Sequence, residues 1–143
     1  MHDLCRSSST DPEAAVKYLI MIMMNPEAGA MWAQMSPERQ RQGYEAHDRV
    51  REAIAAAGEL VTAEALQGPE AARRVRLRGG QVVTTDVPFA EAKEHLAGYY
   101  LVDCPSVEKA VEWAAAMPEA EFVDIEVRPV LDLHPLAGAQ PGT

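Results

Sequence analysis

An uninterrupted apolar segment near the start of the chain constrains its fold more than any other feature. Between residues 16 and 23 only Lys17 is charged, and the remaining side chains are Val, Tyr, Leu, Ile and Met. A strand with one solvated face alternates apolar and polar residues, whereas a strand buried on both faces is apolar throughout. The segment therefore predicts a strand in the middle of a sheet.

The same segment has a second interpretation, as the core of a secretory signal peptide, because small residues follow it at positions 28–30. The acids Asp3, Asp11 and Glu13 offset the basic Arg6 and Lys17, so the positively charged start of a signal peptide is missing. We therefore favour the buried strand. No segment approaches the roughly 20 consecutive apolar residues of a membrane helix, so we expect no membrane association.

Size and charge restrict the class of protein. A chain of 143 residues is the length of one domain. Its net charge of -9 opposes binding to nucleic acid or to anionic lipid, because both need a basic surface. Cys5 and Cys104 lie in unlike contexts and form no C-x-x-C motif, which favours a reducing, cytoplasmic location.

The distribution of proline, glycine and polar residues along the chain predicts one domain at residues 15–131, between a flexible leader (1–14) and a C-terminal tail (132–143). Ser36-Pro37 is a helix start and Gly58 a natural stop. Alternating residues around Gly79-Gly80 predict a hairpin. The expected order is strand 16–23, helix 36–57, strand 59–66, hairpin 74–85, helical turn 90–96, strand 98–103, helix 105–118 and strand 122–130.

Side-chain spacing predicts which face of each element is buried. In the first helix the inward stripe is Gly43, Ala46, His47, Val50, Ile54 and Ala57, and in the second it is Val107, Ala110, Val111, Ala114 and Ala115. On the second strand one face carries Leu60, Thr62, Glu64 and Leu66. On the last strand Val123, Ile125 and Val127 face inward and Asp124, Glu126 and Arg128 face outward.

This order predicts an α+β fold of the ferredoxin-like split β-α-β type with an inserted hairpin. Both helices would cover one face of the sheet, and the chain has no further element to cover the other. Because the central strands are apolar on both faces, the uncovered face would expose a large apolar patch. We therefore expect a homodimer, with sheet packed against sheet as a dimeric α/β barrel.

A motif after the hairpin adds a resemblance to a known family. The segment 84–94 reads T-T-D-V-P-F-A-E-A-K-E, and Gly98-Tyr99-Tyr100 follows it. It resembles the T-D-G-P-F-x-E-x-K-E signature of the DGPF branch of the YCII-related proteins, and further matches extend over residues 16–130. The resemblance implies a dimeric α/β barrel and little about chemistry. Some members are encoded with or fused to sigma factors, and relatives in the wider superfamily act on small aromatic or lactone substrates.

Val87 stands where the motif has glycine. Valine does not easily take a positive φ, although it suits the extended backbone before Pro88. Either the loop never needed glycine, or the site is altered here.

The motif loop is the first candidate site. Asp86, Phe89, Lys93 and Glu94 gather carboxylates, an ammonium group and an aromatic ring within nine residues. An acid beside a base can transfer protons. The structural interpretation is a salt-bridged surface turn, with Asp86 capping loop amides and Phe89 as an anchor.

The second candidate is the outward face of the last strand, where Glu126 and Arg128 would face the space between two sheets. Arg128 could bind an anionic group in a wet cleft there. The alternative is a ladder of salt bridges at the dimer interface.

Other polar residues are weaker candidates for a functional site. His47 lies on an apolar stripe, where histidines are more often packed than catalytic, and His95 reads as a surface residue. Arg74, Arg76 and Arg78 could bind an anion or simply solvate an edge hairpin. No histidine pair has metal-ligand spacing and no cofactor motif occurs, so we expect neither a bound metal nor a cofactor.

Three functions remain open. The first is a small-molecule enzyme with Asp86 as acid or base, Lys93 or Arg128 as anion partner, and Tyr18, Phe89 and Tyr100 as pocket walls. The second is a non-enzymatic ligand-binding or regulatory accessory domain that uses the same cleft. The third is a protein-interaction module.

Overall fold

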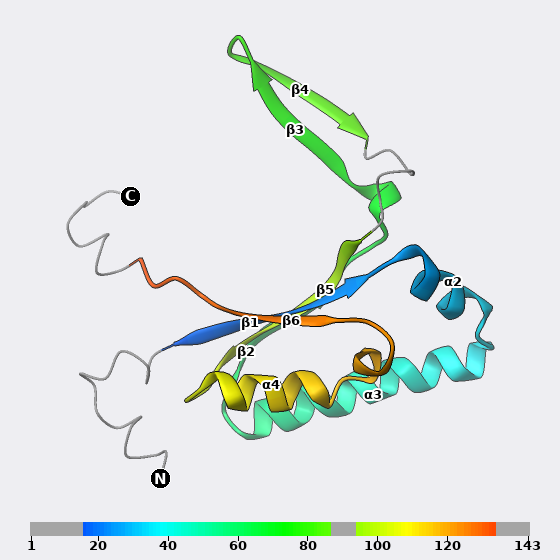
Figure 1. The fold of residues 1–143 in the computed structure, drawn as a ribbon, viewed down its shortest axis with the longest axis vertical. Helices are drawn as coiled ribbons and strands as arrows, with labels where there is room; N and C mark the ends of the chain where they lie inside the picture. The colour runs from blue at the N-terminus through cyan, green and yellow to red at the C-terminus, as the bar shows by residue number, and fades with distance from the viewer. Residues whose placement is uncertain (1–15, 87–93, 134–143) are drawn as a thin grey trace.

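The computed structural model describes residues 16–86 and 94–133 (Figure 1). The elements are β1 (Lys17–Met24), α2 (Pro26–Gln34), α3 (Pro37–Ala56), β2 (Leu60–Ala65), the 3-10 turn η2 (Pro69–Ala71), β3 (Arg73–Arg78), β4 (Gln81–Asp86), β5 (His95–Asp103), α4 (Val107–Ala115), the 3-10 turn η4 (Pro118–Glu121) and β6 (Ile125–Pro129). None of the helices among these residues is long and apolar enough to cross a membrane.

Four strands form one antiparallel sheet in the order β2-β5-β1-β6. The apolar segment is a strand with neighbours on both sides, as its composition predicts. Helix α3 connects β1 to β2, α4 connects β5 to β6, and β5 lies between the parallel strands β1 and β2. These connections are those of a split β-α-β unit. The predicted α+β class is confirmed, while the dimeric barrel concerns a second chain and stays a prediction.

Helices α3 and α4 lie on the same face of the sheet (Figure 1). The core is the layer between them, where Ile20 of β1, Val102 of β5 and Ile54 of α3 are each 0% exposed. Val127 of β6 packs against the same cluster, as its inward position in the sequence pattern predicts. Aliphatic side chains from both the sheet and the helix layer therefore hold the helices on the sheet.

The opposite face of the sheet carries a second set of apolar side chains. Leu19 of β1 pairs with Leu101 of β5, and Met21 pairs with Tyr99. All four side chains are partly exposed, although their neighbours in sequence on the helix side are buried. Within residues 16–86 and 94–133, no helix or strand packs over this face (Figure 1). We call these four residues the open face.

The predicted hairpin is confirmed as a separate two-stranded sheet, β3–β4. Gly79 and Gly80 have φ angles of 56° and 81°, which are the positive values that a two-residue turn between twisted strands requires. The hairpin extends from the end of the main sheet on the side away from α3 and α4 (Figure 1).

The largest differences from the sequence-based predictions lie in three parts of the chain. Helix α2 was not predicted; Asn25 caps it by accepting a hydrogen bond from the Ala28 amide at 2.8 Å. The helical turn 90–96 is wrong at its end, because β5 already begins at His95, and residues 87–93 lie outside the described part. The last strand begins at Ile125 rather than 122, because the amides of Phe122 and Val123 still donate to the Glu119 carbonyl of η4 (Pro118–Glu121).

Two predicted faces are also corrected. A bulge in β2 pairs Leu60 with Val102 but Thr62 with Leu101, so these two residues lie on opposite faces of the sheet. In α4 the buried residues are Ala110 and Ala114, followed by Met117, whereas Val107, Val111 and Ala115 are exposed. Ala57 is the C-cap that follows α3, and it is exposed rather than buried.

We predict that Ile54→Ala lowers the free energy of unfolding by about 3 kcal/mol, because it leaves a cavity in a fully buried layer. The matched control is Val111→Ala on α4, where the side chain is half exposed; we expect a change within about 0.5 kcal/mol there. Urea denaturation followed by circular dichroism measures both. Equal losses in the two variants would contradict the assignment of the core.

Candidate functional site

A cavity of about 750 Å³ opens beside α3, at the end of the sheet from which the hairpin emerges. Its walls come from the ends of β1, β2 and β5, from α2 and α3, and from η4. Aromatic residues from four separate segments contribute, namely Trp32, Tyr44, Tyr99, Tyr100 and Phe122. This volume suits a small organic molecule, and its mixed apolar and polar walls are typical of a ligand pocket.

Three polar side chains meet at the wall of this cavity. His47 is on α3, Tyr100 is on β5 and Glu119 is on η4. The Nδ1 atom of His47 lies 2.8 Å from the Tyr100 hydroxyl, and its Nε2 atom lies 2.7 Å from the Glu119 carboxylate. Both ring nitrogens of the histidine are therefore hydrogen-bonded, on opposite sides of the ring. We call these residues the Glu-His-Tyr cluster.

The partners of His47 determine which nitrogen carries the proton. An ionised carboxylate only accepts hydrogen bonds, so Nε2 must carry a proton and donate a hydrogen bond to Glu119. In the neutral imidazole Nδ1 then accepts from the Tyr100 hydroxyl. When Nδ1 is protonated it donates to the phenol oxygen instead, and that hydroxyl can turn to the His47 carbonyl oxygen, 3.4 Å away. The cluster can therefore accommodate both charge states of the histidine.

Tyr100 is held in its neutral form. Burial raises the pKa of its hydroxyl to about 12, with a smaller lowering influence from the charge of Arg51 and a raising one from Glu119. A neutral phenol donates a hydrogen bond across the whole physiological range. The side chains of His47 and Glu119 are only 20% and 18% exposed, so the carboxylate and imidazole interact in a partly dehydrated setting.

Such an arrangement can move a proton. A carboxylate that accepts from one imidazole nitrogen orients the ring and stabilises the imidazolium that forms when the other nitrogen takes a proton. The buried phenol can then donate a hydrogen bond to a developing oxyanion. The cluster therefore combines a base, a group that orients it and a hydrogen-bond donor in one place.

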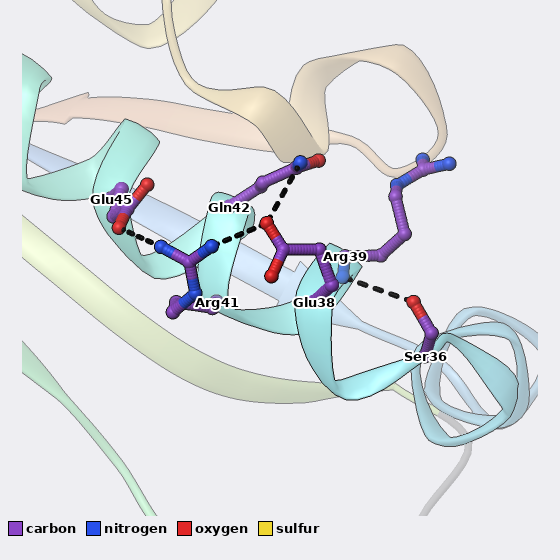
Figure 2. A network of polar contacts seen from close by, with 6 residues as sticks. All are labelled: Ser36, Glu38, Arg39, Arg41, Gln42 and Glu45. Atoms are coloured by element: carbon purple, nitrogen blue, oxygen red, sulfur yellow. Dashed lines mark hydrogen bonds and ion pairs between the residues drawn. The ribbon is translucent and has the colours of Figure 1, made fainter.

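The remaining charged residues at the cavity come from α3, from Glu64 of β2 and from Glu121 of η4. Arg51 pairs with Asp48 at 3.3 Å on the wall. On the outer surface of α3, Arg41 lies between Glu38 and Glu45 (Figure 2). The guanidinium of Arg39, which also lines the cavity, stands apart from that network in Figure 2. An exposed surface network of this kind contributes little to stability.

The predicted motif loop is only partly described. Phe89 and Lys93 lie outside the described residues. Asp86 ends β4 with its side chain 81% exposed, and it pairs across the hairpin with Arg73 at 3.3 Å. Glu94 is exposed at a bend before β5. Neither acid lines the cavity, so the structure separates both from the Glu-His-Tyr cluster.

The other predicted binding residues fall on opposite sides of the sheet. Tyr18 and Tyr100 are buried on the helix side. Glu126 and Arg128 are exposed on the open-face side, where they form an ion pair with each other. Of the predicted catalytic and substrate-binding residues that the structure describes, only Tyr100 lines the cavity. The sheet therefore prevents these residues from forming one pocket.

Glu119 was not among the predicted site residues. It is 72 positions from His47, and it follows a proline in a segment that the sequence marks only as a helix end. His47 itself had been weighed as a packed residue or a general base, and no short-range spacing favours the second. A metal-binding cluster of three or more His, Cys, Asp or Glu side chains does not occur within the described residues.

Comparison with known proteins gives the family. A family model described as the YCII-related domain matches residues 16–134. An uncharacterised protein from Rhizobium meliloti (strain 1021) is 30% identical over 115 residues, which cover 79% of this chain and 90% of that protein. The family expected from the T-D-x-P-F motif is thus confirmed, and the chain belongs to the YCII-related domain family.

Proposed function

We propose that this YCII-related protein is a small-molecule enzyme that performs acid–base chemistry in the cavity beside α3. The observation that carries the proposal is the Glu-His-Tyr cluster, in which His47 lies between a carboxylate and a buried phenol at 2.7 and 2.8 Å. The proposal keeps the acid–base chemistry expected from the motif loop, but it assigns the role of the base to His47 instead of Asp86.

In this mechanism a bound substrate replaces the Tyr100 hydroxyl at Nδ1 of His47. Nδ1 accepts a proton from an acidic C–H or O–H group of the substrate, and Glu119 stabilises the resulting imidazolium through Nε2–H. Tyr100 donates a hydrogen bond to the substrate oxygen that gains negative charge. Return of the proton from Nδ1 to another atom of the substrate completes an isomerisation, and no external reactant is consumed.

A non-enzymatic ligand-binding domain is the second candidate, and one observation favours it. Both nitrogens of His47 are already hydrogen-bonded within the protein, so a substrate must displace Tyr100 before Nδ1 becomes available. A cluster that never opens would act only as a rigid wall for a bound ligand.

We further propose that the protein is a homodimer in which two open faces pack together. Leu19, Met21, Tyr99 and Leu101 present adjacent apolar side chains on a sheet whose other face is covered by helices. Contiguous apolar patches of this kind mark association sites, and packing two sheets face to face buries both patches at once.

We predict that the wild-type protein catalyses deuterium exchange into at least one small lactone or aromatic carbonyl compound in D₂O, measured by proton NMR. His47→Gln should lower the exchange rate by roughly 100-fold or more, because the base is lost. The matched control is His95→Gln, since His95 does not line the cavity; its rate should stay near wild type. Binding of such compounds without any exchange would favour the non-enzymatic candidate, and unchanged exchange in His47→Gln would exclude the cluster.

We predict that one of the four tyrosines ionises near pH 12 and that this step disappears in Tyr100→Phe. An unfolded chain ionises tyrosine near pH 10, whereas burial raises the pKa of Tyr100 to about 12 in the folded state. The free energy of unfolding should therefore fall as the pH rises through this window, and fall less steeply in Tyr100→Phe.

Tyrosinate absorbance and urea denaturation measure the two effects. Tyr44→Phe, at an exposed tyrosine, is the control. Burial also raises the pKa of Cys104 to about 11, so some decline remains in every variant. A tyrosine step near pH 12 that persists in Tyr100→Phe would contradict the assignment.

We predict that Leu101→Lys converts the dimer to a folded monomer, because it places an ammonium group in the middle of the open face. Val111→Lys, at a half-exposed position on α4, should leave the dimer intact. Sedimentation velocity gives the mass and circular dichroism checks the fold. A wild-type protein that sediments as a monomer would refute the proposed pairing.

A further inference from the structure

The β3–β4 hairpin extends from the main sheet without covering any other helix or strand that the structure describes. Every residue of both strands is exposed, and each strand packs chiefly against the other rather than against the rest of the protein. An isolated two-stranded hairpin is marginally stable in water. A hairpin of this kind is therefore expected to have a partner surface.

The two faces of the hairpin differ in character. Val75 pairs with Thr84 and Leu77 pairs with Val82, so these side chains share one face. Val75, Leu77 and Val82 are 68%, 66% and 67% exposed. Arg74, Arg76 and Arg78 alternate with them and belong to the other face. The hairpin is thus amphipathic, although neither face rests on a core.

The charge of the hairpin is opposite to that of the remaining chain. Residues 73–86 contain four arginines and one aspartate, which gives +3, whereas the whole chain carries -9. The rest of the chain therefore carries -12. A body of that charge repels nucleic acid and anionic lipid, but it attracts a basic arm of another copy.

We propose that the hairpin is a clasp that grips a second copy of this chain. The proposal rests on the pairing of open faces inferred above. The hairpin extends on the side of the sheet opposite to α3 and α4 (Figure 1), which is the side on which the second copy would sit. The apolar face of each hairpin packs against the flank of the partner. The arginines of the other face do not contact that flank, and their positive charge attracts the acidic partner over a longer range.

The clasp accounts for three features that the sheet contact alone leaves without a role. It covers Val75, Leu77 and Val82, it brings a segment of net charge +3 to a chain that is otherwise acidic, and it gives the exposed hairpin a surface to pack on. By the two-fold symmetry of a homodimer, each copy both supplies and receives a clasp.

The first test is the double variant Val75→Ser/Val82→Ser, with the dimer dissociation constant measured by sedimentation velocity. We expect the constant to rise about tenfold or more, because two apolar contacts are lost at the interface. The matched control is Val107→Ser/Val111→Ser, which changes two exposed valines on α4; its constant should match wild type. An equal effect in the two variants, or none in either, would overturn the clasp.

The second test needs no variant and uses hydrogen–deuterium exchange of the wild-type chain at concentrations above and below the dissociation constant. Amides of residues 73–86 should become protected as the dimer forms. If the wild type is a dimer but these amides exchange equally fast at both concentrations, the clasp fails and the pairing of open faces stands. A wild type that is monomeric at every concentration would remove both.

Discussion

The apolar contact between one face of the sheet and helices α3 and α4 is the interaction on which the rest of the structure depends. Ile20, Val102 and Ile54 are fully buried in it, and each such side chain contributes about 1.5 to 3 kcal/mol relative to exposure. This contact also sets the rotation of α3. Since Val50 and Ile54 face the sheet, His47 is placed toward Tyr100, and the polar cluster is a consequence of the apolar layer beside it.

The same strands also place apolar side chains on the face of the sheet that the helices do not cover. Successive residues of a strand face opposite ways, so a strand that is apolar throughout covers one layer and leaves another uncovered. The helices cover Ile20 and Tyr100, while Leu19 and Leu101 remain on the open face. The proposed pairing of open faces, together with the clasp, would bury the apolar side chains that the helices leave exposed. In these proposals, chemistry takes place in the cavity beside α3 and association uses the open face.

Local signals in the sequence predicted most of the framework. Ser36 accepts a hydrogen bond from the Arg39 amide at 3.1 Å, Gly79-Gly80 form the turn of the hairpin, and the apolar segment lies inside the sheet. Each of these features could be predicted because it depends on residues that are close in sequence. Helix α2 was missed, since the apolar run and Asn25-Pro26 read as the end of a strand rather than as a cap. The candidate site was harder to predict. Asp86 and Glu94 are close in sequence but outside the cavity, whereas His47 and Glu119 are distant in sequence and in contact.

The sequence by itself determined the α+β class, the order of the elements, the family and the apolar character of both faces of β1. These follow from composition, spacing and short motifs, which are properties of neighbouring residues. Only the tertiary structure decided that His47 lies between Tyr100 and Glu119, and that Glu126 and Arg128 are separated from Tyr18 by the sheet itself. The physical reason is that helix rotation, the bulge in β2 and the position of η4 are set by packing between layers. No residue carries that information alone.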